Sequence, residues 1–474
     1  MAHLPAKPTQ RFIPASLCPA GEDVGSPGLP FEATAQVSGK LQILRNIGWH
    51  SSEKILRLFT GFFVGLWLAR YLGPEDFGSF NFVMAWLGLF NAMAWLGVGE
   101  TIMRDMVRDR TDEGYILGSA FMIRLVGSIL ACGLALGVAL IAGKLSREQM
   151  LLLAILCIGV PFSELPAGVW MWFASHTNIK PAVLGKNFSM VLGALLKVGV
   201  ILAGAGLFSL AAVTAAESVL LCLFLFAAYR TTGQTFAHWR FDLKHAWQML
   251  KAGLPIVLSA LVVSLNARVD QLVLGSMSGM AEVGIYSAAL RFSEIWWVVP
   301  PMIVQTLAAR YIYPKELLGP QLKLNMVRIV SGMALLAVLP CVALGLAGPG
   351  LIAKVLGDQY MGAGAVLVVH IWTAVFVFID APVSQYLLAT DRQRALIVKA
   401  ILMLGFNLGL AVLLVPSYGA VGAAYATLLA QAAALLILPA FSSTLSDLYT
   451  IYLTSLVDVF QWPGRLFRVL RRQY

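Results

Sequence analysis

The sequence predicts an all-α polytopic membrane protein with about twelve transmembrane helices. Of its 474 residues, 59% are hydrophobic and only 12% are charged, whereas soluble domains carry about 25% charged residues. The mean hydropathy is +0.79, and short charged clusters separate apolar stretches of about twenty residues, the length that crosses a bilayer as a helix. This pattern excludes a soluble enzyme, a disordered protein and an outer-membrane barrel, whose strands alternate polar and apolar residues.

Each predicted span is one uninterrupted apolar segment, and its ends are set by charges or by Gly- and Pro-rich turns. The twelve segments are 49–70, 77–101, 116–142, 149–172, 181–205, 208–229, 252–275, 283–309, 325–347, 363–389, 395–415 and 418–440. An even number of spans predicts that both termini lie on one side of the membrane.

Lysine and arginine are concentrated in alternate loops. The loop after the second span carries Arg104, Arg108 and Arg110, and the chain ends with Arg465, Arg468, Arg471 and Arg472. The opposite side carries only Arg70, Lys144, Arg147 and Lys354. Because basic residues accumulate in cytoplasmic loops, both termini are predicted to be cytoplasmic. The formal net charge of +10 is therefore explained by basic residues in cytoplasmic loops and tails. No nucleic-acid partner is expected.

Composition divides the chain into five parts. Residues 1–40 lack an apolar run and are predicted to be a flexible cytoplasmic tail. Residues 41–230 and 252–440 would each form a six-helix bundle, joined by an amphipathic cytoplasmic linker at 231–251 with a surface helix in it. Residues 441–474 are predicted to be an interfacial helix with a basic tail.

Two sequence patterns recur in the second half of the chain. Residues 73–80 and 279–286 share the spacing Gly-x4-Gly-x-aromatic at an offset of 206, and the Gly-rich segments 206–211 and 419–424 correspond at an offset of 213. Similar offsets in corresponding loops predict a duplication of six spans. An even number of spans per half makes the repeats parallel rather than inverted.

These residues also carry a family resemblance. The run Arg70-Tyr-Leu-Gly-Pro-Glu-Asp-Phe-Gly78-Ser-Phe and the later run Val283-Gly-Ile-Tyr286-Ser-Ala-Ala-Leu-Arg291 resemble the polysaccharide transporter family of the multidrug/oligosaccharidyl-lipid/polysaccharide exporter superfamily. The resemblance covers about residues 41 to 440. It implies two six-helix bundles (a 6+6 pseudo-repeat) around a central cavity that opens alternately to each side.

The function implied by this resemblance is that of a lipid-linked oligosaccharide flippase in the bacterial inner membrane. Its cargo would be an undecaprenyl-diphosphate-linked repeat unit, and its pathway the biosynthesis of lipopolysaccharide O-antigen, exopolysaccharide or capsule. A polysaccharide polymerase and a chain-length regulator would be its protein partners.

Four arginines inside predicted spans are candidates for binding the diphosphate. Arg268 and Arg291 fall at similar height in the outer half of the bilayer, and Arg57 and Arg124 in the inner half. Charges at such depth are costly and usually face a wet cavity or one another. An arginine also offers a fork of donors to a diphosphate.

Local pairing is the alternative for two of these arginines. Glu294 lies three residues after Arg291, and Glu53 lies one turn before Arg57, so each carboxylate is on the same helix face as its arginine. Either pair would keep the buried charges neutral without any cargo.

Four further charges are predicted to act as charge partners or coupling groups. Lys197 and Glu217 lie at comparable depth in neighbouring spans, which predicts a salt bridge. Asp270 is expected to pair across helices. Asp380 has no obvious partner on its own helix, so it either carries a coupling H⁺ or Na⁺ or caps an arginine.

Catalytic motifs are absent from the sequence. It contains no GxxxxGK[ST] phosphate loop, no HExxH metal pair and no GxSxG nucleophile elbow. We therefore expect neither an enzyme nor a resident metal or cofactor, and transport would draw on an H⁺ or Na⁺ gradient or on the membrane potential. The alternatives are a cation-coupled multidrug antiporter of the same superfamily and a non-transporting scaffold of a polysaccharide machine.

Overall fold

The computed structural model describes residues 31–95, 98–108, 113–176, 178–314, 319–437, 439 and 445–470. Residues 46–474 form one compact unit and residues 1–45 a separate one. Most of the predicted tail lies outside the described residues, as do Arg471 and Arg472. The part of the tail that is described, from Phe31 on, is helical. All regular structure in the described ranges is helical.

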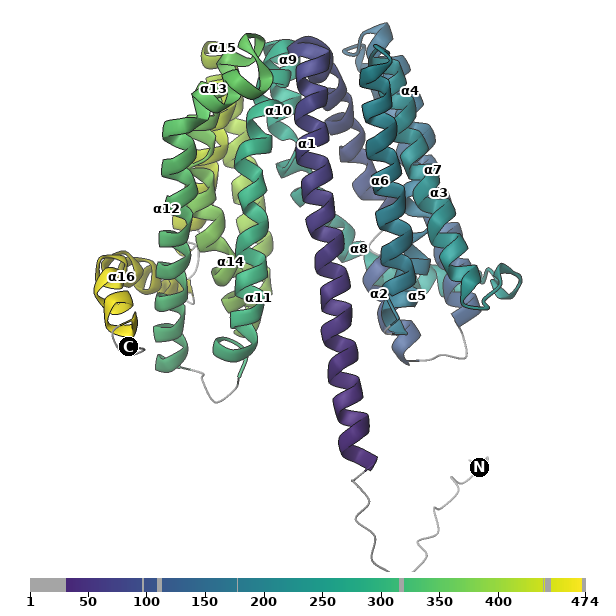
Figure 1. Ribbon diagram of the computed structural model, residues 1–474, viewed down its shortest axis with the longest axis horizontal. Helices are drawn as coiled ribbons and strands as arrows, with labels where there is room; N and C mark the ends of the chain where they lie inside the picture. The colour runs from purple at the N-terminus through teal and green to yellow at the C-terminus, as the bar shows by residue number, and fades with distance from the viewer. Residues whose placement is uncertain are drawn as a thin grey trace, which may run out of the picture. The chain divides into compact units, whose positions relative to one another are not determined.

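The first half of the chain supplies seven helices. They are α1 (Phe31–Trp95), α2 (Val98–Arg108), α3 (Glu113–Ala142), α4 (Arg147–Glu164), α5 (Ala167–Ser175), α6 (Lys180–Leu202) and α7 (Leu207–Thr231). Figure 1 shows α3, α4, α6 and α7 side by side, in agreement with their contacts. The segment α2 is a helix where the sequence predicted the end of a span and a basic loop.

The described residues of the second half form long helices and several short ones. They are η1 (Phe236–His238), α8 (Leu243–Asn266), α9 (Val269–Met277), α10 (Met280–Glu294), η2 (Ile295–Val298), α11 (Val299–Tyr311), α12 (Pro320–Leu356), η4 (Asp358–Tyr360), α13 (Met361–His370), α14 (Thr373–Ala389), α15 (Gln393–Ile437) and α16 (Ser446–Leu470). The helix α12 contacts α13, α14 and α16 (Figure 1).

The twelve predicted crossings are all present as helices. Among the described residues, seven helices are long and apolar enough to cross a membrane, and the bent pair α13/α14 makes an eighth crossing. Two of the seven, α1 and α15, are each two helices joined at a glycine with non-helical backbone, Gly73 or Gly419. The helices α8, α9, α10 and α11 cover the two other predicted spans, 252–275 and 283–309.

The predicted duplication is visible in the backbone. Gly73 ends the first crossing with φ 76° and ψ 170°, and Gly279, 206 residues later, ends the seventh with φ 96° and ψ 173°. Only glycine adopts such angles without strain. The same residue type therefore makes the same turn at the same place in both halves.

The second glycines of the two motifs pack against each other. A Cβ atom added to Gly78 would lie 1.7 Å from the carbonyl oxygen of Met280, and one added to Gly284 would lie 1.9 Å from that of Pro74. Because neither position has room for a methyl group, the backbones of the two halves touch directly. We call this region the Gly73 end.

The prediction of a separate linker helix is wrong. Helix α8 begins at Leu243, where the Asp242 side chain caps it by accepting from the amide of His245 at 3.0 Å, and it continues unbroken to Asn266. Ala246 and Met249 of this helix belong to the same buried cluster as residues of α2 and α3. Residues 243–251 of the predicted linker are therefore the first turns of α8, and they pack against α2 and α3.

Helix α16 lies in the segment predicted to be an interfacial helix, and one of its faces is buried. Leu448 and Ile451 are fully buried, whereas Leu453, Leu456 and Val457 are more than 60% exposed. The hydroxyl of Ser455 donates to the carbonyl oxygen of Val327 in α12 at 3.3 Å. One face of α16 is therefore fixed on the second half, and the other is available to lipid.

An ion pair fixes the start of α16. The Asp447 carboxylate accepts from Arg392 Nη1 at 2.9 Å and from the Tyr386 hydroxyl at 2.5 Å. Partial burial raises the pKa of Asp447, but the hydrogen bonds from Arg392 and Tyr386 outweigh it and hold this pKa below the usual aspartate value.

Candidate functional site

A cavity of about 260 Å³ lies between α1, α6 and α7, and one residue of α10 closes it. Its charged lining consists of Arg57, Lys197, Glu217 and Arg291. We call it the cationic cavity, because three of these four side chains carry positive charge. Four predicted site residues, distant in sequence and drawn from both halves of the chain, thus meet in one cavity.

Arg57 pairs locally with Glu53, the alternative that the sequence left open. Glu53 is buried and also accepts from Lys186 Nζ at 3.1 Å, so one carboxylate faces two cations. The Arg57 side chain remains 58% exposed. Since Glu53 neutralises only one of the two charges, this edge of the cavity keeps a net positive charge.

Arg291 is not paired with Glu294 in the structure. Its Nη1 donates to the carbonyl oxygen of Gly61 at 2.9 Å, and its guanidinium lies over the Phe77 ring at 5.3 Å. The group rests on Gly65, where an added Cβ would lie 1.9 Å from Nη1. Arg291 thus reaches from the second half into the N-terminal half, and no carboxylate is hydrogen-bonded to it.

The predicted salt bridge between Lys197 and Glu217 is present, with Nζ and Oε2 2.5 Å apart. The carboxyl group of Glu217 packs on Gly193, where an added Cβ would lie 2.6 Å from its Cδ. The pair forms one wall of the cationic cavity. It adds polar atoms to that wall without adding net charge.

Arg124 and Arg268 lie elsewhere. Arg124 is fully buried inside the N-terminal half, where Nη1 donates to Glu164 Oε2 at 2.8 Å, while Nε and Nη2 have no partner. Arg268 lies between α8 and α9, with its side chain against Gly88 of α1. Arg57 and Arg124, which the sequence places at similar depth, do not share a cavity, and each has its own carboxylate.

Asp270 lies in a sealed polar cluster of the second half. Its Oδ2 accepts from the Tyr286 hydroxyl at 3.0 Å and from the Thr427 hydroxyl at 2.9 Å. Among the described residues, no hydrogen bond of 3.5 Å or less reaches its Oδ1 or either amide atom of Asn407, a fully buried side chain close enough to interact with Asp270. We call these four residues the Asp270 cluster. Its buried, unpartnered oxygens suit a proton or a small cation with hard oxygen ligands.

Asp380 has a partner on another helix. Lys399 Nζ of α15 lies 2.5 Å from Asp380 Oδ1 and 3.0 Å from the Ser384 hydroxyl. Its carboxylate is therefore neutralised by a lysine, not by an arginine. Among the described residues, Asp270 and Glu294 are the two candidate carboxylates with no cation hydrogen-bonded to them, and Asp270 is the one enclosed in a cluster of polar side chains.

The repeat relates the two sites. At the offsets of 206 and 213 residues, the members of the Asp270 cluster (Asp270, Tyr286, Asn407 and Thr427) correspond in order to Val64, Phe80, Ala194 and Thr214. All four of the latter residues line the cationic cavity. The duplicated halves thus place different chemistry at one internal location: an open cationic cavity in the first half and a sealed carboxylate in the second.

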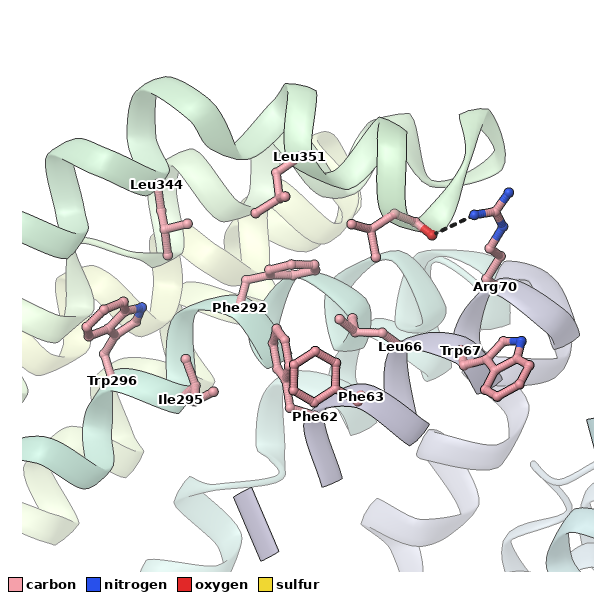
Figure 2. A pocket seen from close by; sticks show the side chains of 11 residues that line it. Phe62, Phe63, Leu66, Trp67, Arg70, Phe292, Ile295, Trp296, Leu344 and Leu351 are labelled. Atoms are coloured by element: carbon pink, nitrogen blue, oxygen red, sulfur yellow. Dashed lines mark hydrogen bonds between the residues drawn. The ribbon is translucent and has the colours of Figure 1, made fainter. Parts of the chain in front are cut away.

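A second cavity, of about 640 Å³, lies on another face of α1. Figure 2 shows Phe62, Phe63 and Leu66 of α1 opposite Phe292 and Leu351 of the second half, with Arg70 at one end. Every other lining residue is apolar or aromatic. We call it the apolar cavity; its walls suit a hydrocarbon chain, and its one cation lies at an end.

The family model described as polysaccharide biosynthesis protein matches residues 43–315, more than half of the chain. The chain belongs to the polysaccharide biosynthesis protein family. Within this family context, the succinoglycan biosynthesis transport protein ExoT of Rhizobium meliloti (strain 1021) is 24% identical over 277 residues, which are 57% of this chain and 53% of that protein. The match thus spans about half of the relative's length.

Solved transporter structures share the fold. A lipid II flippase MurJ in an inward closed conformation has a TM-score of 0.65 and 17% identity over 88% of this chain and 92% of its own. An inward-facing multidrug resistance MATE family transporter has a TM-score of 0.68 and 16% identity over 83% and 96%. These likenesses confirm the expected fold, and its several long apolar helices make this member of the family a multi-pass membrane protein.

Sequence reasoning missed Glu164, Lys186, Lys399 and Asn407. The first three are ionisable groups inside apolar helices, so counting every intramembrane charge would have found them. Asn407 carries no charge, and only its unpartnered, buried amide marks it.

Proposed function

We propose that this family member is a flippase that moves an undecaprenyl-diphosphate-linked oligosaccharide across the bacterial inner membrane for O-antigen, exopolysaccharide or capsule biosynthesis. The observation that carries the proposal is the cationic cavity, in which Arg57 and Lys197 of the first half face Arg291 of the second. If cations from both halves bind one anion of the cargo, cargo binding would be linked to movement of the halves.

The size of the cationic cavity selects the part of the cargo that enters it. Its volume of about 260 Å³ is below the range of roughly 300–1,000 Å³ typical of pockets for drug-sized ligands. A diphosphate fits such a space, whereas an oligosaccharide must stay outside it. The excess of cations over carboxylates also disfavours the cationic cargo expected of a multidrug antiporter.

The two cavities suit the two ends of such a lipid. They lie on different faces of α1 and share the region around Phe292 and Arg291 of the second half. A diphosphate held at Arg291 would leave its polyprenyl chain free to enter the apolar cavity. This arrangement keeps the hydrocarbon in an apolar environment while the charges stay paired.

Coupling to an ion gradient is proposed at the Asp270 cluster. A proton or Na⁺ bound there would fill the unpartnered Oδ1 of Asp270 and the amide oxygen of Asn407. The site is separate from the cargo cations, so ion and cargo would act on different halves. The proposed orientation places both termini in the cytoplasm. The proposed protein partners are a polysaccharide polymerase and a chain-length regulator.

Leaflet exchange of a fluorescent polyprenyl diphosphate in proteoliposomes tests the function. The wild type should move the probe between leaflets, and Arg291→Ala together with Arg57→Ala should slow exchange at least tenfold. The matched control is Arg310→Ala, an exposed arginine outside the cavity. Exchange that is absent in the wild type, as a scaffold or a drug antiporter predicts, would overturn the proposal.

A further inference from the structure

Two helix ends, one from each half, cap each other at the Gly73 end. The first helical segment of α1 stops at Gly73, and Pro74 has no N–H, so the helical hydrogen bond from residue 74 to the carbonyl of Arg70 cannot form. Gln359 Nε2 of η4 supplies that donor at 3.0 Å. A side chain of the second half thus satisfies a carbonyl that the helix break in the first half leaves free.

The capping is reciprocal. Helix α12 ends at Leu356, which places the Val355 carbonyl among the terminal carbonyls that a helix leaves unsatisfied. Arg70 Nη1 donates to this oxygen at 3.2 Å, the dashed contact in Figure 2. A cation at a helix C-terminus is also favoured by the helix dipole.

Tyr360 makes the most protected of these contacts. Its side chain is fully buried, and its hydroxyl donates to the carbonyl oxygen of Ala69, also fully buried, at 2.8 Å. Gln359 and Arg70 are exposed by comparison. Because a hydrogen bond shielded from water is stronger than one that water competes for, Tyr360 should dominate the set.

We propose that Tyr360, Gln359 and Arg70 form a latch that holds the two halves together at the Gly73 end and sets how often that end opens. The inference rests on the movement of the two halves that the proposed function requires, but not on the identity of the cargo. When the halves part, each freed carbonyl exchanges its partner for water, so each bond has a small net effect and the latch is reversible.

The close packing of Gly78 and Gly284 sets the geometry of the closed state, because no side chain separates the two backbones. Leu66, Phe77 and Phe82 of the first half also share a buried apolar cluster with residues of the second half. Opening this end therefore separates apolar contacts as well, and the latch bonds add to them and shift the balance between the closed and open states.

Removing the Tyr360 hydroxyl tests the latch. One neutral hydrogen bond corresponds to a change of about threefold to tenfold in an equilibrium constant, so Tyr360→Phe should raise the ratio of open to closed by about that factor. Gln359→Ala, at an exposed site, should shift the ratio in the same direction by less. This second variant keeps the test valid if the buried substitution impairs folding.

Distances between spin labels report the ratio. Labels at Glu75→Cys and Lys354→Cys, both exposed, would be placed in full-length protein whose five native cysteines are replaced by alanine. Double electron–electron resonance in lipid nanodiscs without cargo then gives the closed and open populations. Tyr71→Phe is the matched control, since its hydroxyl donates to the Ala205 carbonyl within the first half at 3.2 Å.

The expected result is a larger long-distance population in Tyr360→Phe and Gln359→Ala and an unchanged distribution in Tyr71→Phe. Unchanged distributions in both latch variants, or an equal shift in Tyr71→Phe, would overturn the latch. If the variants show these shifts but the protein does not exchange the lipid diphosphate between leaflets, the latch is supported and the proposed function is contradicted.

Discussion

Gly65 is the position at which one methyl group tests the cationic cavity. In Gly65→Ala, the added Cβ would lie 1.9 Å from Nη1 and 2.5 Å from Cζ of Arg291. These atoms are the flexible end of a long side chain, so the guanidinium should move and the backbone should stay. The charge of Arg291 is retained, but its bond to the Gly61 carbonyl is broken.

The magnitude follows from two opposing effects. A hydrogen bond from a charged donor contributes about 1.5–3 kcal/mol, and alanine is favoured over glycine inside a helix by about 1 kcal/mol. Gly65→Ala should therefore lower the free energy of unfolding by about 0.5–2 kcal/mol. Gly133→Ala in α3, outside the cationic cavity and with nothing within 4 Å of its added Cβ, should raise it by up to about 1 kcal/mol.

Thermal unfolding in detergent and leaflet exchange of a polyprenyl diphosphate provide the two measurements. If the displaced guanidinium weakens transition-state contacts by about 1.4 kcal/mol, exchange in Gly65→Ala falls about tenfold, while Gly133→Ala stays near the wild-type rate. Equal stabilities and equal exchange rates for the two variants would refute the assigned position of Arg291.

Three further predictions concern charges outside the cationic cavity. Asp270→Asn should abolish the dependence of exchange on an imposed H⁺ or Na⁺ gradient while leaving probe binding intact; a retained dependence would remove the cluster from coupling. Arg124→Met should lower stability by about 3–5 kcal/mol because it leaves Glu164 buried without its cation, and Glu164→Gln in the same protein should restore much of the loss, as seen in thermal unfolding. The pKa of Asp447 is lowered by Arg392, so its contribution to docking of α16 is complete above the usual aspartate pKa and is lost as the pH falls through the lower folded value. Hydrogen exchange of α16 should therefore rise below about pH 4, and an α16 whose exchange does not change with pH would argue against this anchor.

The two-fold internal repeat explains why the charged residues are so unevenly distributed. The same location holds Val64 in one half and Asp270 in the other, and both halves retain a threonine on the last helix of the bundle, Thr214 or Thr427. A location that tolerates either an open cavity or a buried carboxylate lets one scaffold provide separate sites for cargo and for a coupling ion.

The family, the number of crossings and the duplication could all be predicted from the sequence. Apolar length and the two Gly-x4-Gly motifs are local properties, and Gly73 and Gly279 adopt the same turn because only glycine tolerates positive φ there without strain. The pairing of Lys197 with Glu217 was also predictable, since equal depth on neighbouring spans leaves few other partners.

The division of the arginines was decided by the tertiary structure. Residues at one predicted depth, Arg57 and Arg124, lie in different surroundings, because depth along a helix does not fix the direction in which a side chain points. The partner of Asp380 lies on α15, nineteen residues away in sequence, and no helical spacing reveals such a contact. The low charge content of the chain determined by itself that the protein lies in a membrane. Only the packing of the helices decided which few charges share a cavity, because that depends on contacts between segments that are distant in sequence.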